Sequence, residues 1–107
     1  MGADSQHMNA VRKAVLAVLY ENREDDLSSE RLYIKVLRHM LPKMPEQHLV
    51  KSTVDKLANE GYVKFKEDIT GNTIVKLSEK GVELSEKEQE QFKATVDKLA
   101  TKLSNSH

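Results

Sequence analysis

The hydrophobic period of this chain changes at Gly61, and that change limits the folds open to it more than any other feature. Over residues 45–60 apolar side chains recur at helical spacing, which predicts an amphipathic helix that Gly61 closes. Over residues 62–66 apolar and polar side chains alternate, and residues 73–77 supply a returning strand. Turn-forming residues 68–72 lie between the two strands. The pattern therefore predicts an α+β fold that is mainly α with a small β-hairpin.

Two more helices are expected before residue 45. The first spans residues 9–21, with Asn9 as its N-cap. The second begins after the N-cap Ser28 and stops before Pro42, because the residue preceding a proline is pushed out of helical geometry. Pro45 suits the first position of the third helix, where its missing N–H costs nothing.

The chain is expected to end in an added helix. Residues 78–81 predict a short turn or helix after the hairpin. Ser85 followed by Glu88 has the spacing of a capping box, which predicts a new helix over residues 86–103.

Two segments flank the hairpin and carry a family resemblance, and their order strengthens it. They are Leu57-Ala58-Asn59-Glu60-Gly61-Tyr62-Val63 and Val75-Lys76-Leu77-Ser78-Glu79-Lys80-Gly81. The first resembles the end of a recognition helix entering a wing strand. The second is similar to the close of the wing in MarR, PadR and ArsR-like transcriptional regulators. The resemblance implies a winged helix-turn-helix domain with an added C-terminal helix.

These expectations divide the chain into three parts. Residues 1–7 are interpreted as an expression remnant, because His7-Met8 matches a common cloning site. Residues 8–84 form the expected winged-helix domain. Residues 85–107 form the C-terminal helix.

The resemblance implies that the chain binds double-stranded DNA and regulates transcription, with helix 45–60 in the major groove and the wing, residues 62–77, against the backbone. Lysine, glutamine and serine side chains can contact bases or phosphates. The expected DNA-binding residues are Arg31, Lys35, Arg38, Lys43, Gln47, His48, Lys51, Ser52, Asp55, Lys64, Lys66, Asn72 and Lys76.

The charge of the chain limits this interpretation. Lysine and arginine number 17 and aspartate and glutamate number 17, so the formal net charge is zero. A nonspecific polyanion binder would be strongly basic. A protein-interaction adaptor built on the same fold, without DNA binding, is therefore the alternative function.

Several other classes of protein are disfavoured by the sequence. It has no cysteine, which indicates a reducing compartment, and we expect a cytoplasmic protein with no membrane partner. No nucleophile motif, phosphate loop or metal-ligand cluster is present, so we expect no enzyme activity, cofactor or metal. His39 and His48 are expected to be surface or capping side chains.

Apolar residues on the first and last helices suggest assembly. Those on the last helix repeat at spacings of four, three and four, close to a coiled-coil seam. The last helix is expected either to fold back onto the first helix or to form a homodimer. The residues expected at the dimer contact are Leu16, Tyr20, Phe92, Val96, Leu99 and Leu103.

Overall fold

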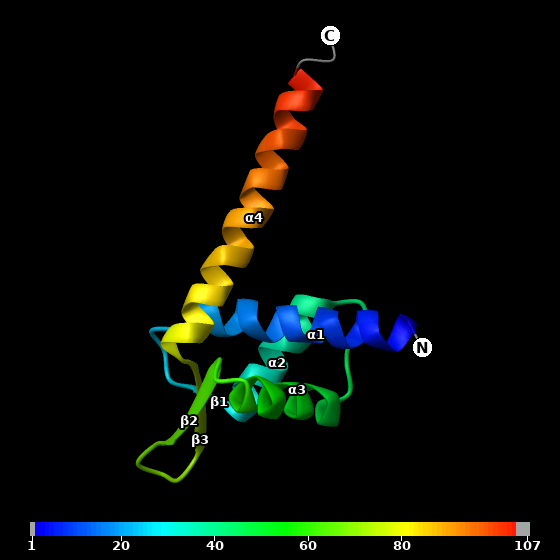
Figure 1. Ribbon diagram of the computed structural model, residues 1–107. Helices are drawn as coiled ribbons and strands as arrows, with labels where there is room; N and C mark the ends of the chain where they lie inside the picture. Colours follow the sequence, from blue (N-terminus) through cyan, green and yellow to red (C-terminus); the bar gives the residue numbers. More distant parts are fainter. Residues whose placement is uncertain (1, 105–107) are drawn as a thin grey trace.

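The computed structural model describes the backbone of residues 2–104 and the side chains of residues 7–102. Helices precede and follow a small antiparallel sheet (Figure 1). The elements in chain order are α1 (Gly2–Glu21), β1 (Leu27–Ser28), α2 (Ser29–Met40), α3 (Gln47–Asn59), β2 (Val63–Glu67), β3 (Thr73–Leu77) and α4 (Glu79–Ser104). This order confirms the predicted α+β class.

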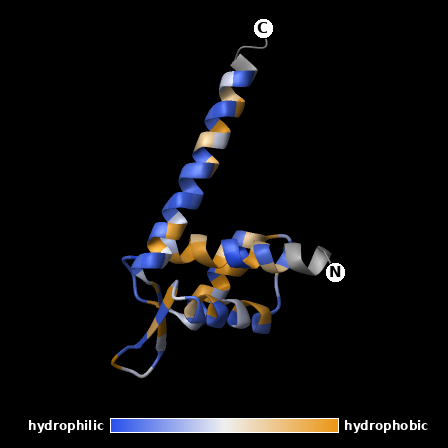
Figure 2. Cartoon of the chain, viewed as in Figure 1, coloured by the Kyte–Doolittle hydropathy of each residue, from blue (hydrophilic) through white to orange (hydrophobic). Residues whose placement is uncertain are grey.

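Helix α1 lies at the centre of the fold. It contacts α2, α3, β3 and the beginning of α4, and it is therefore buried on several sides. Its second apolar strip is covered by the chain itself, since Leu16 is only 1% exposed. The buried side chains of α1 are Val11, Ala14, Val15, Leu16, Val18 and Leu19. Figure 2 shows apolar residues concentrated in this body and scattered among polar ones along α4.

Two predicted helix starts are wrong. Asn9 was expected to cap the first helix, but α1 begins at Gly2 and Asn9 lies inside it. Pro45 was expected at the first position of the third helix, whereas the N-cap is Glu46 and α3 begins at Gln47. Pro45 is buried just before the cap. In both cases the residue type permits a helix to begin at that position but does not require it.

The start of α2 agrees with the sequence, and a short strand precedes it. Ser28 Oγ accepts a hydrogen bond from the Arg31 amide at 3.2 Å, which satisfies one free amide of the first turn. Leu27 and Ser28 also pair antiparallel with Val75 and Ile74. The sheet order is therefore β1-β3-β2. A strand of two residues is too short to give a period in the sequence.

The end of α3 is a glycine-terminated turn, as predicted. Gly61 has a φ of 87°, a region in which residues with a Cβ are strained. Its amide donates to the Ala58 carbonyl at 3.0 Å, and the Tyr62 amide donates to the Leu57 carbonyl at 2.9 Å. This pair of bonds is the Schellman arrangement, and it directs the chain straight into β2.

The predicted break before the last helix is absent, because α4 runs without interruption from Glu79 to Ser104. Ser78 begins it, with its Oγ accepting from the Gly81 amide at 3.1 Å. Ser85 is not a cap: it lies inside α4, is 4% exposed, and its Oγ has no hydrogen-bond partner among the described residues. Beyond the first turns α4 projects from the body (Figure 1).

Candidate nucleic-acid interface

The outer face of α3 is open to solvent. The side chains expected there, Gln47, His48, Lys51, Ser52 and Asp55, are all exposed. The inner face packs into the core through Val50, Thr53, Val54 and Leu57, and Thr53 Oγ1 donates to the Leu49 carbonyl at 2.7 Å. Helix α3 therefore presents a polar surface that the described part of the chain does not cover.

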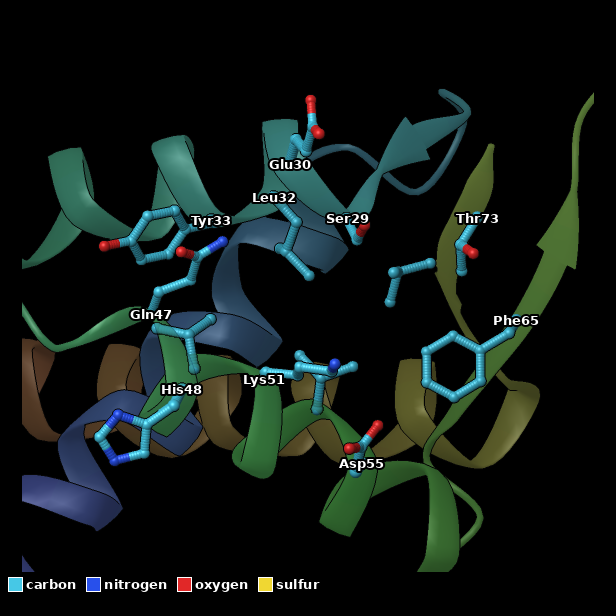
Figure 3. A pocket seen from close by; sticks show the side chains of 13 residues that line it. Ser29, Glu30, Leu32, Tyr33, Gln47, His48, Lys51, Asp55, Phe65 and Thr73 are labelled. Atoms are coloured by element: carbon cyan, nitrogen blue, oxygen red, sulfur yellow. The ribbon is translucent and has the colours of Figure 1, made fainter. Parts of the chain in front are cut away.

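A hollow of about 660 Å³ lies beside this face, between the first turns of α2, helix α3 and the wing (Figure 3). We define the wing as β2, β3 and the turn that joins them. The apolar floor of the hollow consists of Leu32, Val50, Val54, Phe65 and Val75. Its polar rim consists of Ser29, Glu30, Tyr33, Gln47, His48, Lys51, Asp55 and Thr73.

The charges around the hollow nearly balance. Lys51 is the permanent cation of the rim, and Glu30 and Asp55 bring two carboxylates. His48 Nδ1 lies 3.1 Å from Glu46 Oε2 beside the rim, with both side chains largely exposed. The permanent charges of the lining residues therefore sum to −1, and Lys51 is the one permanent cation among them.

The basic residues of α2 that are expected to contact DNA do not line the hollow. Arg31, Lys35 and Arg38 follow one another at helical spacing and form one stripe of α2. Glu30 and Tyr33 belong to a different stripe, and it is this one that borders the hollow. Lys43 is exposed in the turn after α2 and does not line the hollow either.

The wing lysines, also expected to contact DNA, occupy the other face of the sheet. Val63 pairs with Leu77 and Phe65 with Val75, and these residues face the core and the hollow. Successive side chains in a strand alternate between faces. Lys64, Lys66 and Lys76 therefore point away from the side on which α3 lies.

Two of these lysines hold the loop before β1. Asp26 Oδ1 lies 3.0 Å from Lys66 Nζ and 3.2 Å from Lys76 Nζ. The hydrogen bond from Lys66, followed by that from Lys76, lowers the pKa of Asp26 below its ordinary value of 3.8. Because these lysines already have a partner, they are less available to phosphates than free lysines would be.

Replacing Asp26 with asparagine should lower the urea midpoint of unfolding slightly at neutral pH. A lowered folded-state pKa stabilises the fold above the unfolded pKa, and this stabilisation disappears as pH falls through the folded value. The difference between the two proteins should therefore shrink when the pH falls below 3.8. Urea titrations over a pH series test this, with Asp25→Asn as the control. A difference that stays constant into acid would contradict the ion-pair account.

The tip of the wing is a well-ordered turn. Asp68 Oδ1 accepts from the Thr70 hydroxyl at 2.7 Å and from the Thr70 and Asn72 amides at 2.9 Å each. The Thr70 hydroxyl bond, followed by the Asn72 amide bond, lowers the pKa of Asp68. Gly71 adopts a φ of 86°. The tip holds Asn72 exposed, as expected, and leaves Ile69 with its full surface in solvent.

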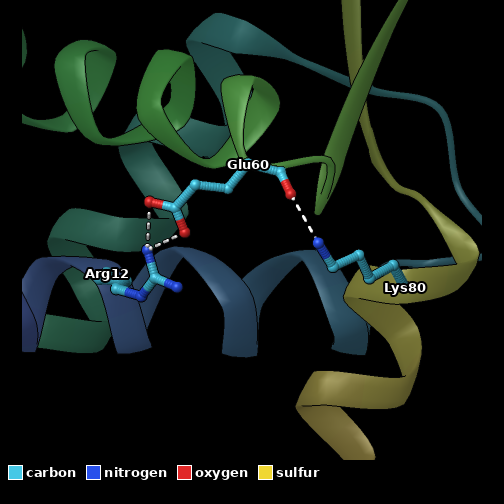
Figure 4. A network of polar contacts seen from close by, with 3 residues as sticks. All are labelled: Arg12, Glu60 and Lys80. Carbon is cyan, nitrogen blue, oxygen red and sulfur yellow. Dashed lines mark hydrogen bonds and ion pairs between the residues drawn. The ribbon is translucent and has the colours of Figure 1, made fainter.

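The two segments that carried the family resemblance contact each other (Figure 4). Arg12 of α1 forms an ion pair with Glu60 at 3.0 Å, and Lys80 Nζ donates to the Glu60 carbonyl at 2.9 Å. Ser78 Oγ donates to the Gly61 carbonyl at 2.5 Å. The Tyr62 ring lies 5.6 Å from the Arg12 guanidinium and 4.6 Å from Lys80 Nζ. The end of α3 is thus joined to the start of α4.

Sequence reasoning missed several residues of the hollow, namely Ser29, Glu30, Tyr33, Phe65 and Thr73. The alternation of the strand contained the signal for Phe65, since the buried Val63 sets the face on which Phe65 must lie. Glu30 and Tyr33 gave no such signal. Their place depends on how α2 crosses α3.

The residues expected at a dimer contact differ in how far they are exposed to solvent. Leu16 is in the core and cannot reach a partner, so that expectation is wrong. Tyr20 is partly buried, and its hydroxyl lies 3.4 Å from Glu86 Oε1. Phe92, Val96 and Leu99 are 73%, 43% and 56% exposed. The side chain of Leu103 lies outside the described residues. The exposed residues of α4 do not fold back onto α1 (Figure 1).

Among the described residues, no group of three or more histidine, aspartate or glutamate side chains is arranged to hold a metal ion. None of the helices in residues 2–104 is long and apolar enough to cross a membrane.

No protein-family model matches the sequence, and no curated protein is significantly similar to it. Solved structures do resemble the fold. A point mutant of MepR from Staphylococcus aureus is 18% identical, with a TM-score of 0.76, over 89% of this chain and 66% of that one. A MarR-family transcriptional regulator from Silicibacter pomeroyi is 19% identical, with a TM-score of 0.65, over 91% of this chain and 62% of that one.

F93 from STIV, described as a winged-helix DNA-binding protein, is 25% identical, with a TM-score of 0.63, over 76% of this chain and 85% of the other. The chain spans slightly less than two thirds of the two longer regulators. MepR is a transcription regulator, the Silicibacter pomeroyi protein is a transcriptional regulator, and F93 is a DNA-binding protein. The chain has a winged-helix fold of the MarR-like kind.

Proposed function

We propose that this chain is a DNA-binding transcription regulator that inserts α3 into the major groove and sets the wing tip against the neighbouring backbone. One observation supports this most: the outer face of α3 is polar and fully open, with the wing beside it. A helix of this width fits the major groove. The wing contributes its tip, through Asn72, rather than the lysines of its far face.

The hollow lies between the two elements proposed to contact DNA, helix α3 and the wing. In this arrangement Gln47, Lys51 and Ser52 meet base edges or phosphates, and the carboxylate of Asp55 is placed to accept from a cytosine amine. Because Glu30 and Asp55 offset Lys51, little affinity comes from unspecific phosphate attraction. The proposal therefore implies a sequence-selective protein with weak nonspecific binding.

Fluorescence anisotropy with duplexes from a randomised pool, selected by binding at low salt, tests the function. Phosphate contacts are strongest at low salt, so binding is expected there first. Absence of any bound duplex at low salt would overturn the proposal.

Lys51→Ala should weaken binding to a selected duplex about tenfold and reduce the slope of log Kd against log salt by about one if Lys51 contacts a phosphate. Lys51 is the permanent cation bordering the hollow, so its loss removes the largest favourable charge of the face. Lys87→Ala, on exposed α4, is the matched control and should bind as the parent does. Equal losses in both variants would mean that net charge, not the α3 face, drives binding.

We also propose that the protein acts as a homodimer through α4. Phe92, Val96 and Leu99 form an exposed apolar stripe on a projecting helix. Two winged-helix bodies related by a two-fold axis would address two half-sites about one DNA turn apart. Sedimentation across a range of protein concentrations tests the dimer directly.

A protein-interaction adaptor is the second candidate, and the wing tip favours it. Ile69 is fully exposed on a turn that is already ordered, so docking it into a partner costs little further conformational entropy. Glu67 and Asp68 make this tip acidic, which disfavours phosphate. If Ile69→Ser leaves DNA binding intact and abolishes capture of a specific protein, this second function is the better one.

A further inference from the structure

We propose that the outer face of α2 binds an acidic amphipathic helix of another protein. This face is the side of α2 away from the buried Leu32 and Val36. Its residues are Arg31, Ile34, Lys35, Arg38 and Leu41. The inference does not depend on the proposed DNA contact, and it adds a protein partner on a different side of the molecule.

An exposed apolar ridge runs along the outer face of α2. Ile34 is 47% exposed, and Leu41, seven residues later, is 60% exposed. Seven residues are close to two helical turns, so these two side chains lie on the same side of α2, about 10 Å apart along its axis. The half-buried Leu37 lies one turn before Leu41 and widens the ridge. A partner that covers this ridge gains stability from the apolar area that it removes from water.

Three cations flank the ridge on one side. At about 100° per residue, Arg31, Lys35 and Arg38 all lie within about 100° of Ile34 in the same direction around the helix. Among the described side chains of residues 7–102, no carboxylate forms an ion pair with any of the three. Residues 31–45 contain no aspartate or glutamate. The outer face of α2 is therefore apolar along its centre and positive along one edge.

The placement of these cations does not favour the helix itself. Arg31 lies in the first turn of α2, where the positive end of the helix dipole disfavours a cation. Lys35 follows four residues later, and like charges at this spacing repel each other. Carboxylates of a partner would offset both effects, which is charge complementarity of the kind found across protein interfaces.

The position of the outer face favours a protein over DNA. The residues of α2 that border the hollow are Ser29, Glu30, Leu32 and Tyr33 (Figure 3). Arg31 and Arg38 are turned about 150° around the helix from Tyr33, so a duplex set against α3 meets the other side of α2. A phosphate backbone would also leave Ile34 and Leu41 uncovered. An amphipathic helix covers the ridge and the cations together.

The same pattern defines the partner helix. Apolar side chains at spacings of three and four give it a stripe that packs on the ridge. Carboxylates along one edge of that stripe face the three cations. Exposed ion pairs alone contribute little, so binding requires both the apolar contact and the charges. The surface is small, and we therefore expect a transient complex.

Selection from a displayed library of randomised peptides of about 16 residues, four to five helical turns, tests the inference. The target is the full chain, free of DNA. The selected peptides should be acidic and should have apolar residues at helical spacing. Fluorescence anisotropy then measures their affinity for the parent and for variants. Because no DNA is present, failure of the proposed DNA binding leaves this result unchanged.

Two variants on the outer face should weaken binding of a selected peptide. Ile34→Ser should weaken it about tenfold or more, because it removes apolar area at the centre of the contact. Arg31→Glu should weaken it on the order of fivefold, and less at high salt. Lys13→Glu on α1 makes the same change in net charge, and Ile69→Ser removes an exposed apolar side chain elsewhere, so both controls should bind as the parent does. All four side chains are exposed, and urea unfolding should confirm that the variants fold.

Three outcomes would overturn the proposal. Selected peptides without acidic and amphipathic character would contradict the charge complementarity. Equal affinity of the parent, Ile34→Ser and Arg31→Glu, or a loss in Ile69→Ser alone, would place the contact elsewhere. Displacement of the peptide by a duplex that Arg31→Glu weakens and Ile34→Ser does not would assign the cations to phosphates instead.

Discussion

Replacing Gly81 with alanine is expected to lower the free energy of unfolding by about 3 kcal/mol, the upper end of the usual cost of overpacking. A Cβ at Gly81 would overlap the Tyr62 carbonyl oxygen and lie 3.0 Å from a Leu77 methyl. The carbonyl cannot easily move away, because it accepts a hydrogen bond from the Ser78 amide at 3.0 Å. Chemical denaturation measures the change. At an ordinary helical position the same substitution would stabilise by about 1 kcal/mol.

The matched control is Gly71→Ala at the wing tip. Gly71 has a φ of 86°, and no described atom lies within 4 Å of the added Cβ. Its cost is therefore backbone strain alone, about 1 kcal/mol. A Gly81→Ala protein as stable as the parent would mean that the start of α4 does not rest on the Tyr62 carbonyl. The joint between α3 and α4 would then be looser than described.

Leu16→Ala should destabilise the protein by about 2–5 kcal/mol, the range for removing a large buried side chain. Leu16 is 1% exposed within a single chain, and its neighbours are core residues of the same chain. The loss should therefore be the same at every protein concentration. Thermal and urea unfolding at several concentrations provide the measurement.

Phe92→Ala is the counterpart, because Phe92 is 73% exposed. It should leave the unfolding of the body unchanged at concentrations low enough for monomer and lower the stability only where the dimer forms. If Leu16→Ala instead showed the concentration dependence, Leu16 would belong to the dimer contact after all.

Much of the fold could be predicted because its limits are set by local chemistry. Gly61 must end α3, since only glycine takes its backbone angle without strain. Ser28 caps α2 with its own hydroxyl. The change from helical to alternating spacing fixed the hairpin, whose strands lie within one residue of the predicted ranges. These features depend on residues close together in the sequence.

The sequence could not show contacts that join distant segments. Asp26 pairs with Lys66 and Lys76, which strand alternation places on the far face of the wing, and the residues around those lysines give no sign of this ion pair. Ser85 has the sequence signature of a cap, yet Ser78 had already begun the helix and left no reason for a break. The side of α2 that meets α3 depends on a crossing angle, which a one-dimensional pattern does not contain.

The order of the sheet has a consequence for solubility. Strand β2 lies at the edge, so its outer backbone groups have no strand neighbour in the described sheet. Such edges attract strands from other molecules. Lys64, Lys66 and Glu67 place charge along this edge, where an incoming strand would have to bury them. Lys64 and Lys66, which point away from the α3 face, therefore disfavour aggregation through this edge.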